Sequence, residues 1–224
     1  MIETEKRAWL AEHLSFWDHL SEEEKDTLCA GTKPVHYKKE ENVHSGSNDC
    51  VGVVMVRSGQ LRTYMLSEDG REVTLYRLDP GDICVLSASC VLETITFDVF
   101  VDADVDTDIY LLGSAVFHRL SDENIYVRCA AHELATTRFS QVMWAMQQIL
   151  FMKVDQRLAI FLWDESTKTN SNVLKLTHEQ VARYMGSARE VVTRMLKYFA
   201  EEGIVTLSRG TITIIDRDKL RKLL

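Results

Sequence analysis

The sequence predicts an α+β protein of two domains, with a β-rich N-terminal part and a helical C-terminal part joined by one long helix. Three observations support this class. Short apolar or alternating runs separated by turn clusters fill residues 35–112. A stretch of nearly thirty residues without glycine or proline follows from about residue 122. Two adjacent helix-start signals then precede a hairpin-like segment, as in a winged helix-turn-helix.

The bulk composition is that of a globular protein. With 224 residues, 46% apolar and 27% charged, the chain is long enough for two domains and too apolar to be disordered. Its N-terminus lacks the apolar stretch of a secretory signal, and no segment approaches about 18 consecutive apolar residues, so we expect a cytoplasmic protein with no membrane partner. Five scattered cysteines, an odd number, indicate reduced thiols.

Residues 1–30 are expected to be helical, because apolar side chains recur three and four positions apart from Trp9 to Trp17. Ser21 and Glu24 form a capping-box pattern that opens a second short helix. From residue 35 to residue 112 the pattern changes to strands, with runs such as VGVVMV, QLRTYML, EVTLYRL, TITFDVFV and DIYLL. Many short strands at regular spacing predict a sandwich or a barrel.

A long helix is predicted for residues 122–151. It carries a narrow apolar stripe, at alternating spacings of four and three, of the kind that seams two helices together: Ala135, Phe139, Val142, Met146 and Ile149. This stripe predicts a dimer. Because it spans only about two heptads, packing of the helix on its own domain stays open as the alternative.

Two successive capping-box patterns follow, Thr177 with Gln180 and Ser187 with Glu190. Each predicts a helix start, and Gly186 between them lets the chain turn. The helices are expected in LTHEQVARYMG and SAREVVTRMLKYFAEEG, after a helix in VDQRLAIFLWDE and a polar loop STKTNSN. A hairpin in IVTLSRGTITII adds a small wing.

The second of these helices has two unlike faces. One is apolar and expected to be buried: Ala188, Val191, Val192, Met195, Leu196 and Phe199. The other presents groups that can pair with base edges and phosphates: Arg189, Glu190, Thr193, Arg194 and Lys197. The N-terminal part of such a helix enters the major groove, so the first four are the predicted base readers. The plainer alternative is a solvated face with a Glu190–Arg194 ion pair.

The distribution of charge agrees with a local DNA-binding surface. The chain carries a formal net charge of −8, yet residues 176–224 hold nine Lys or Arg against six Asp or Glu. That segment is therefore at +3 and residues 1–175 are at −11. A nucleic-acid footprint can occupy one face of an otherwise acidic molecule.

Three ordered motifs, LTHEQVARYMG, AREVVTRML and EEGIV, make residues from about 150 to 215 resemble the DNA-binding domain of the Crp/Fnr family of bacterial transcription regulators. A weaker match in GQLRTYMLSEDGREVTLYRLDPGD extends the resemblance to residues 20–150. It implies a cyclic-nucleotide-binding-like β-roll, which is a double-stranded β-helix or jelly roll. The domains would then be a β-roll sensor with N-terminal helices (1–121), a dimerisation helix (122–151) and a winged helix-turn-helix (152–224).

The resemblance implies roles for individual residues. Arg189, Glu190 and Arg194 occupy the family's base-reading places, and Thr193 stands where the oxygen-sensing branch commonly has Ser. Because Arg189 suits guanine, a TGTGA-like half-site is expected in preference to a TTGAT-like one. Three further residues from the caps and the wing complete the predicted DNA-binding set: Thr177, Ser187 and Arg209.

Cyclic AMP is not expected as the effector. In cyclic-nucleotide-binding members of the family, a Glu holds the ribose and an Arg-Ser pair holds the phosphate. Counted from the Gly-Asp pair, Leu86 stands at the Glu position, and Thr96 and Phe97 stand at the Arg-Ser position. Residues 78–118 contain no Lys or Arg, although a buried phosphate needs such partners.

Other effectors are less constrained. The oxygen-sensing branch holds an iron-sulfur cluster on N-terminal cysteines, and the first 28 residues here contain none, so a cluster is not expected. Haem ligation by Cys84, His36 or His44 stays open. Cys84 and Cys90 flank VLSAS at the family's ligand cassette. They are either small buried side chains or a thiol pair that senses redox poise or binds a soft ligand. An apolar or aromatic metabolite is the competing effector.

We therefore expect a homodimeric transcription regulator that binds palindromic double-stranded DNA, responds to an unidentified effector and has RNA polymerase as a further partner. No catalytic residue and no metal-ligand set is predicted, so the chain is not expected to be an enzyme. Two other classes stay open. A cupin-like enzyme would need His-x-His and a carboxylate, whereas the roll offers only His36 and His44. A cyclic-nucleotide-regulated module would need the missing Arg-Ser pair.

Overall fold

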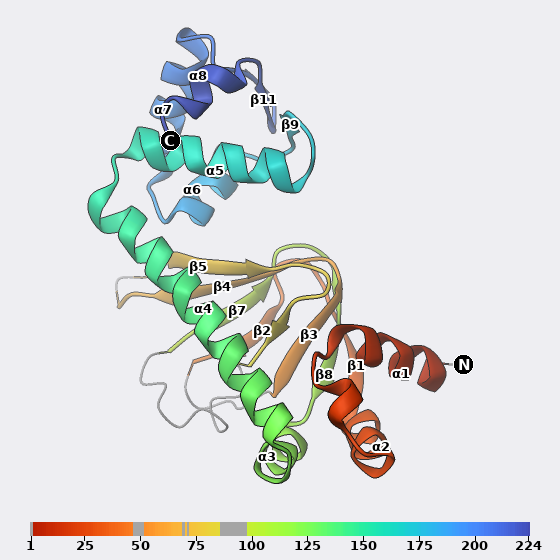
Figure 1. The fold of residues 1–224 in the computed structure, drawn as a ribbon. Coiled ribbons are helices and arrows are strands. Elements are labelled where there is room, and N and C mark those ends of the chain that lie inside the picture. The colour runs from red at the N-terminus through yellow and green to blue at the C-terminus, as the bar shows by residue number, and fades with distance from the viewer. Residues whose placement is uncertain (1, 47–51, 69, 71, 86–97) are drawn as a thin grey trace. The chain divides into compact units, whose positions relative to one another are not determined.

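The computed structural model describes residues 2–46, 52–68, 70, 72–85 and 98–224 (Figure 1). The chain forms two compact units, residues 1–66 with 75–142 and residues 67–74 with 143–224. No helix in the described part of the chain has the length and apolar composition that crossing a lipid bilayer requires. Four residues named in the predictions lie outside the described residues: Leu86, Cys90, Thr96 and Phe97.

The N-terminal helices are α1 (Ile2–His13), a 3-10 turn η1 (Trp17–His19) and α2 (Glu22–Gly31). The predicted capping box at the start of α2 is confirmed. Ser21 Oγ accepts a hydrogen bond from the Glu24 amide at 3.2 Å, and the Glu24 carboxylate accepts one from the Ser21 amide at 2.7 Å. These helices bury apolar side chains against the strands that follow.

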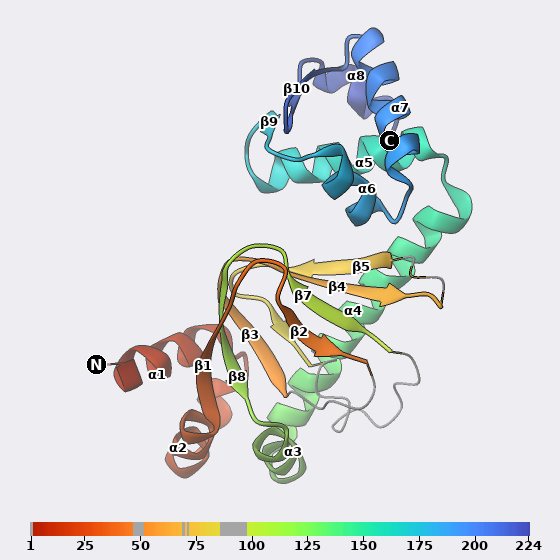
Figure 2. The same ribbon diagram turned by 180° about the vertical axis from the view of Figure 1, so that it is seen from behind.

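The described residues of the β part form two four-stranded sheets with antiparallel pairing, and these confirm the predicted sandwich (Figures 1 and 2). Their strand orders are β1-β8-β3-β6 and β2-β7-β4-β5. The strands are β1 (Thr32–Tyr37), β2 (Asn42–Ser45), β3 (Val53–Ser58), β4 (Leu61–Leu66), β5 (Glu72–Leu78), β6 (Ile83–Cys84), β7 (Phe100–Ala103) and β8 (Thr107–Leu112).

Strand β3 is covered on both faces, which explains its unbroken apolar run. Alternate side chains of a strand point to opposite faces. Val53 and Met55 pack with the helices, whereas Val54 and Val56 pack between the two sheets. Gly59 follows the strand with φ +86°, and a Cβ at this position would lie 2.5 Å from a backbone carbonyl oxygen of the facing turn. No larger residue fits there without a shift of the backbone.

Helix α3 (Ser114–Glu123) precedes the long helix α4 (Ile125–Phe151), and Asn124 separates them with extended backbone angles. The predicted start at residue 122 therefore falls in the last turn of α3. The side-chain amide of Asn124 donates to the carbonyl of His19 at 3.1 Å and to Glu24 at 3.0 Å, and its oxygen accepts from the Tyr126 amide at 3.0 Å. The local bond from the Tyr126 amide competes with a continuous helix, and the two bonds to His19 and Glu24 hold Asn124 against the N-terminal helices.

The C-terminal unit confirms the helix-turn-helix and the wing (Figure 2). Its core joins all of its helices to a small sheet in the order β10-β11-β9. Strand β9 and helix α8 were not predicted. The elements are α5 (Val154–Lys168), β9 (Val173–Leu174), α6 (His178–Met185), α7 (Arg189–Glu201), β10 (Val205–Ser208), β11 (Thr211–Ile214) and α8 (Arg217–Arg221).

The loop predicted for STKTNSN begins three residues later than expected, because α5 continues to Lys168. Its hydroxyl side chains bond back to the helix. Ser166 and Thr167 donate to the carbonyl of Trp163 at 2.8 and 2.9 Å, and Thr169 donates to that of Glu165 at 2.7 Å. Polar residues of this kind signal a loop by composition alone, but here they are satisfied on the last turn of a helix.

Candidate nucleic-acid interface

The turn between α6 and α7 is built from backbone hydrogen bonds. Thr177 caps α6 as predicted: its Oγ1 accepts from the Gln180 amide at 3.2 Å, and Gln180 Oε1 accepts from the Thr177 amide at 2.9 Å. Gly186 then ends the helix in the left-handed region (φ 58°, ψ 45°). The Ser187 amide donates to the carbonyl of Ala182 at 2.9 Å, which closes the turn.

The second predicted capping box, Ser187 with Glu190, is wrong. The N-cap of α7 is Ala188, and no side chain caps the helix there. The physical reason is that the Ser187 amide is used to close the preceding helix, so α7 starts one residue later than the pattern suggested. Glu190 is then the second helical residue, which is not the position from which a capping box closes.

The two faces of α7 are those predicted, with one exception. Val192, Leu196 and Phe199 are fully buried at 0% exposure in the core of the unit. Val191 and Met195 are half-buried. Ala188, predicted on the buried face, is exposed because it precedes the first turn.

The outward face of α7 is an open depression lined by seven side chains, and we call it the α7 face: Arg189, Glu190, Thr193, Arg194, Lys197, Tyr198 and Glu201. All five residues predicted for the outward face of this helix are among them, whereas Thr177, Ser187 and Arg209 of the predicted DNA-binding set are not. Tyr198 and Glu201 were missed. Helical spacing contained the signal, because each lies four residues after a predicted member, Arg194 and Lys197 respectively.

The ion pairs at this face are weak. Arg189 Nε lies 3.7 Å from Glu179 Oε2 of α6, and the two side chains are 65% and 58% exposed. An exposed pair of this kind contributes about 0–1 kcal/mol, so the guanidinium can exchange its partner at low cost. The described contacts contain no Glu190–Arg194 ion pair, which was the alternative reading of this surface.

The wing places one further cation at its tip. Strands β10 and β11 pair antiparallel from Val205 with Ile214 to Ser208 with Thr211. The two-residue turn between them contains Arg209, which is exposed. A short hairpin holds this guanidinium at the end of a paired ladder, as a backbone contact from the wing would require.

The sensor candidates lie in the N-terminal unit. Cys84 of β6 is 1% exposed, and its Sγ lies 3.7 Å from Tyr76 Oη. Burial, reinforced by Cys84, raises the pKa of Tyr76 well above its ordinary value of 10, so the phenol stays protonated. Cys90 lies outside the described residues, so the thiol pair stays a prediction. His36 and His44, named as possible ligands, lie on β1 and β2 of different sheets.

One buried cation of this unit was missed by the sequence analysis. Arg138 of α4 is 4% exposed and donates to the carbonyl of Ile83 at 3.0 Å, to Asp82 at 3.3 Å and to Gln141 at 2.9 Å. Its guanidinium also lies 5.1 Å from the centre of the Tyr76 ring. Its position in the sequence could have predicted its burial. Arg138 follows Val127, Ala131 and Leu134 at spacings of three and four, on the side of the helix that packs against its own unit.

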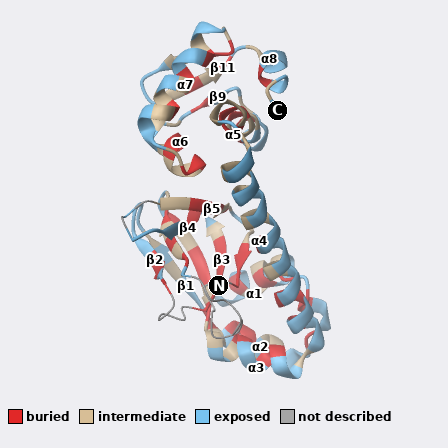
Figure 3. Cartoon of the chain, turned by 90° about the vertical axis from the view of Figure 1, so that its left-hand side faces the viewer, coloured by how far each residue is buried: buried red, intermediate tan, exposed pale blue. Residues whose placement is uncertain are grey.

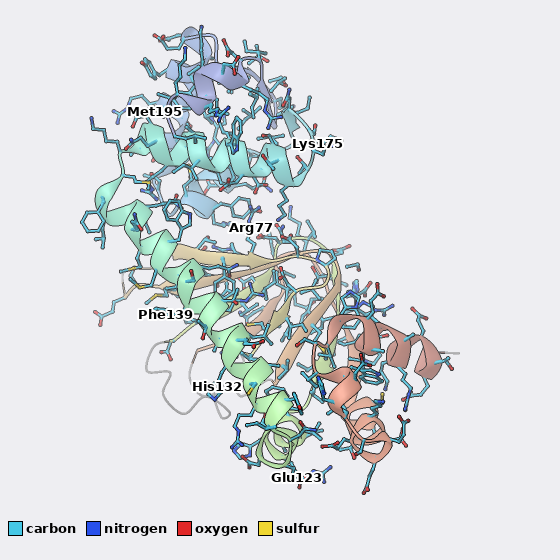
Figure 4. All side chains as sticks on the ribbon, viewed as in Figure 1. Arg77, Glu123, His132, Phe139, Lys175 and Met195 are labelled. Carbon is cyan, nitrogen blue, oxygen red and sulfur yellow. The ribbon has the colours of Figure 1, made fainter. Side chains whose placement is uncertain are left out.

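The predicted dimer seam is divided between two surfaces. Ala135 and Val142 pack on the core clusters of their own chain, whereas Phe139 and Met146 are exposed at 65% and 42%. Figure 4 labels Phe139 on α4, and Figure 3 colours much of this helix as exposed. Ile149 is half-buried. Four of the exposed apolar residues of α4 recur at spacings of four, three and four, and we call them the α4 stripe: Phe139, Met143, Met146 and Leu150.

Comparison with known proteins identifies the family. Residues 156–223 match the family model of the Crp-like helix-turn-helix domain. A solved structure from Eubacterium rectale, assigned to the Crp/Fnr family of transcriptional regulators, aligns with a TM-score of 0.88 and 43% identity, over 95% of this chain and 98% of that one. This chain belongs to the Crp/Fnr family. The resemblance inferred from the three motifs is therefore confirmed.

Two curated Crp/Fnr relatives align along most of their length. The regulatory protein HlyX of Actinobacillus pleuropneumoniae is 24% identical over 87% of this chain and 82% of its own. The cAMP-activated global transcriptional regulator Vfr of Pseudomonas aeruginosa is 22% identical over 84% of this chain and 92% of its own. HlyX is by name a regulatory protein and Vfr a transcriptional regulator, and this chain carries the Crp-like helix-turn-helix domain of a transcription regulator.

Proposed function

We propose that this protein is an effector-responsive, homodimeric transcription regulator that inserts α7 of each protomer into successive major grooves of a palindromic site, about 34 Å apart. The α7 face carries the proposal. It presents two arginines, a lysine, two glutamates, a threonine and a tyrosine on the outside of a helix whose other side packs into the core through Val192, Leu196 and Phe199. The α4 stripe supplies an apolar surface for the dimer contact.

The roles within the α7 face follow from hydrogen-bonding chemistry. Arg189 and Arg194 suit the two acceptors of guanine, and Glu190 suits the cytosine amino group. Four residues around the face are assigned to phosphates: Lys197, Thr177, Ser187 and Arg209. With Arg189 as a guanine reader, the half-site is proposed to be TGTGA-like, and recovery of TTGAT half-sites from random duplexes would reject that assignment.

The test replaces both arginines. We expect Arg189→Ala with Arg194→Ala to weaken binding to a duplex selected by the native protein by roughly thirtyfold or more, since each lost base pairing costs about 1–3 kcal/mol. The matched control removes two exposed cations from the other unit, Lys39→Ala with Arg119→Ala, and leaves affinity within about threefold. Equal affinity of the native and Arg189/Arg194 proteins, measured by fluorescence anisotropy, would reject the proposal.

The effector is proposed to be something other than cyclic AMP. Support comes from the lack of Lys and Arg in residues 78–118 and from Arg138, which already binds Asp82 and the Ile83 carbonyl. A calorimetric titration with cyclic AMP should show no saturable heat. A binding isotherm would refute the proposal.

A redox signal or an apolar metabolite is proposed in its place, with no iron-sulfur cluster and with haem as a further candidate. The double variant Cys84→Ser with Cys90→Ser distinguishes a redox signal from an apolar metabolite or haem, because a switch between thiols and a disulfide requires both sulfurs. If DNA affinity of the native protein changes between oxidant and reductant and the double variant loses this change, the thiols carry the signal. An unchanged response in the variant would contradict the thiol pair.

A further inference from the structure

The hydroxyl of Thr193 is held by a histidine of the neighbouring helix. His178 is the first residue of α6, and its Nδ1 lies 3.1 Å from Thr193 Oγ1 of α7. Within the described part of the chain this is the only hydrogen bond of the Thr193 hydroxyl. Thr136 and Thr137 of α4 instead donate to carbonyls four residues back, at 2.8 and 3.0 Å. The hydroxyl on the α7 face is therefore turned toward His178.

Burial and nearby positive charge both favour the neutral form of the His178 ring. Burial, with Arg189 and Lys197 of α7 nearby, lowers the pKa of His178 below its ordinary value of 6.5. The adjacent carboxylate of Glu179 is paired with Arg189. From α5, which also packs on α6, Arg157 binds the carbonyl of Met185 at the far end of the helix. A neutral ring protonated at Nε2 leaves Nδ1 as a hydrogen-bond acceptor.

We propose that His178 is a specificity-determining residue that sets the hydrogen-bonding role of Thr193 at the base edge. While Nδ1 accepts, the Thr193 hydrogen points at His178 and the oxygen lone pairs face the groove, which selects the amino group of adenine or cytosine. A proton on Nδ1 makes the ring the donor. The Thr193 hydrogen is then released toward the groove and selects acceptors, which are guanine O6 or N7, thymine O4 and adenine N7, so that cytosine is disfavoured.

This inference rests on the proposed function, because it needs α7 in a major groove. It adds a residue that does not itself contact the base. It also makes the preferred base depend on pH at one position of the site. His178 is the only histidine after residue 132 in the sequence, so titration of this ring can be separated from that of the six others.

The experiment selects duplexes from a random library of roughly 22 base pairs, long enough for two half-sites one helical turn apart. It is run at about pH 8 and about pH 5.5, on either side of the ordinary histidine pKa. Thr193→Val locates the base pair opposite residue 193, because selection relaxes there when the hydroxyl is removed. At that pair we expect the native protein to favour adenine or cytosine at pH 8 by roughly three- to tenfold, and to lose or invert this preference at pH 5.5.

Two variants of His178 carry the decision. His178→Phe removes the acceptor and should abolish the preference at that pair, whereas His178→Gln keeps a polar group that cannot titrate and should give the same preference at both pH values. Thermal unfolding verifies that both variants fold. Overall affinity can rise in acid for every sequence alike, since a protonated ring adds a cation near phosphate. The readout is therefore base identity at one position.

The outcomes test the role of His178 separately from the proposed binding of α7 in a major groove. An enriched site whose Thr193-facing base pair ignores both pH and the His178 variants would overturn the inference and leave the proposed function standing. Failure of the native protein to enrich any sequence at either pH would overturn both.

Discussion

Gly186 fixes the turn on which the α7 face depends. Its left-handed conformation lets the amides of Gly186 and Ser187 reach carbonyls of the last turn of α6. A Cβ at this position would meet only ordinary contacts, the nearest at 3.6 Å from Val73. Steric room is therefore available, and the requirement for glycine comes from the backbone angles alone.

Two substitutions of Gly186 distinguish the effect of side-chain contacts from the effect of the left-handed backbone angles. Gly186→Ala should lower the free energy of unfolding by about 1–2 kcal/mol, the cost of the left-handed region for an ordinary residue. Gly186→Asn should lower it less, because asparagine tolerates that region. Chemical denaturation of both variants measures the difference. Equal destabilisation by alanine and asparagine would show that contacts, and not backbone angles, require the glycine.

Residue-level prediction from sequence succeeded where the signal was local. The Thr177–Gln180 capping box and the alternation of faces on α7 involve residues at most a few turns apart. It failed for Ser187, because its amide is used by the preceding helix. The bond between His178 and Thr193 joins residues fifteen positions apart on two helices, and its formation depends on how the helices pack.

At the scale of elements, α4 serves two surfaces at once. Val127, Ala131 and Arg138 bury one side of it in its own unit, while the α4 stripe stays exposed on another. Members of the Crp/Fnr family act as dimers, and an exposed stripe at spacings of four and three is the pattern by which two helices pair. The stripe is therefore the surface on which a dimer test should be made.

Phe139→Lys tests the stripe. Burying a phenylalanine contributes about 1.5–3 kcal/mol, and each dimer holds two copies, so we expect the dimer dissociation constant to rise by roughly a hundredfold or more. Thr137→Lys is the matched control, because Thr137 is exposed on the same helix but outside the stripe. Sedimentation velocity measures both. A Phe139→Lys protein that dimerises as tightly as the Thr137→Lys protein would exclude the stripe as the contact.

The sequence predicted the long helix and an apolar seam, and the exposed α4 stripe shares Phe139 and Met146 with that seam while replacing Val142 and Ile149 by their neighbours Met143 and Leu150. Periodicity shows that a helix has an apolar side, and it does not show which part of that side the rest of the same chain covers. Ala135 and Val142 pack against the core of their own unit. Strand β9 and helix α8 were missed because two and five residues are too short for any period to emerge.

For the whole molecule, charge is divided along the chain. Residues 176–224 carry +3 within a protein of net −8, so binding to DNA must be dominated by a few cations close to the duplex. The excess of negative charge elsewhere opposes approach at low ionic strength. Salt screens that repulsion, but affinity is still expected to fall steeply with salt, because each phosphate neutralised by these cations releases counterions from the DNA.

Lys197→Ala measures one such contact. Each lysine that neutralises a phosphate contributes about 0.9 to the slope of log affinity against log salt concentration, so two protomers should lose about 2 from that slope. Binding should weaken for all duplex sequences alike. Thr193→Val provides the comparison, since it should alter sequence preference and keep the slope. An unchanged slope for Lys197→Ala would remove this residue from the phosphate contacts.

Strand β3 has a consequence for how the chain finds its correct pairing. In a strand with one buried face, shifting the pairing register by one residue exposes the apolar side chains to water, and this free-energy cost disfavours the shifted register. Residues 53–56 of β3 are buried on both faces, so a shifted register would still bury apolar side chains, and hydrophobicity alone does not distinguish the registers. Gly59 supplies the missing discrimination, because any slipped pairing would press a side chain into the opposing main chain. Steric exclusion at Gly59, and not hydrophobicity, selects the pairing register of β3.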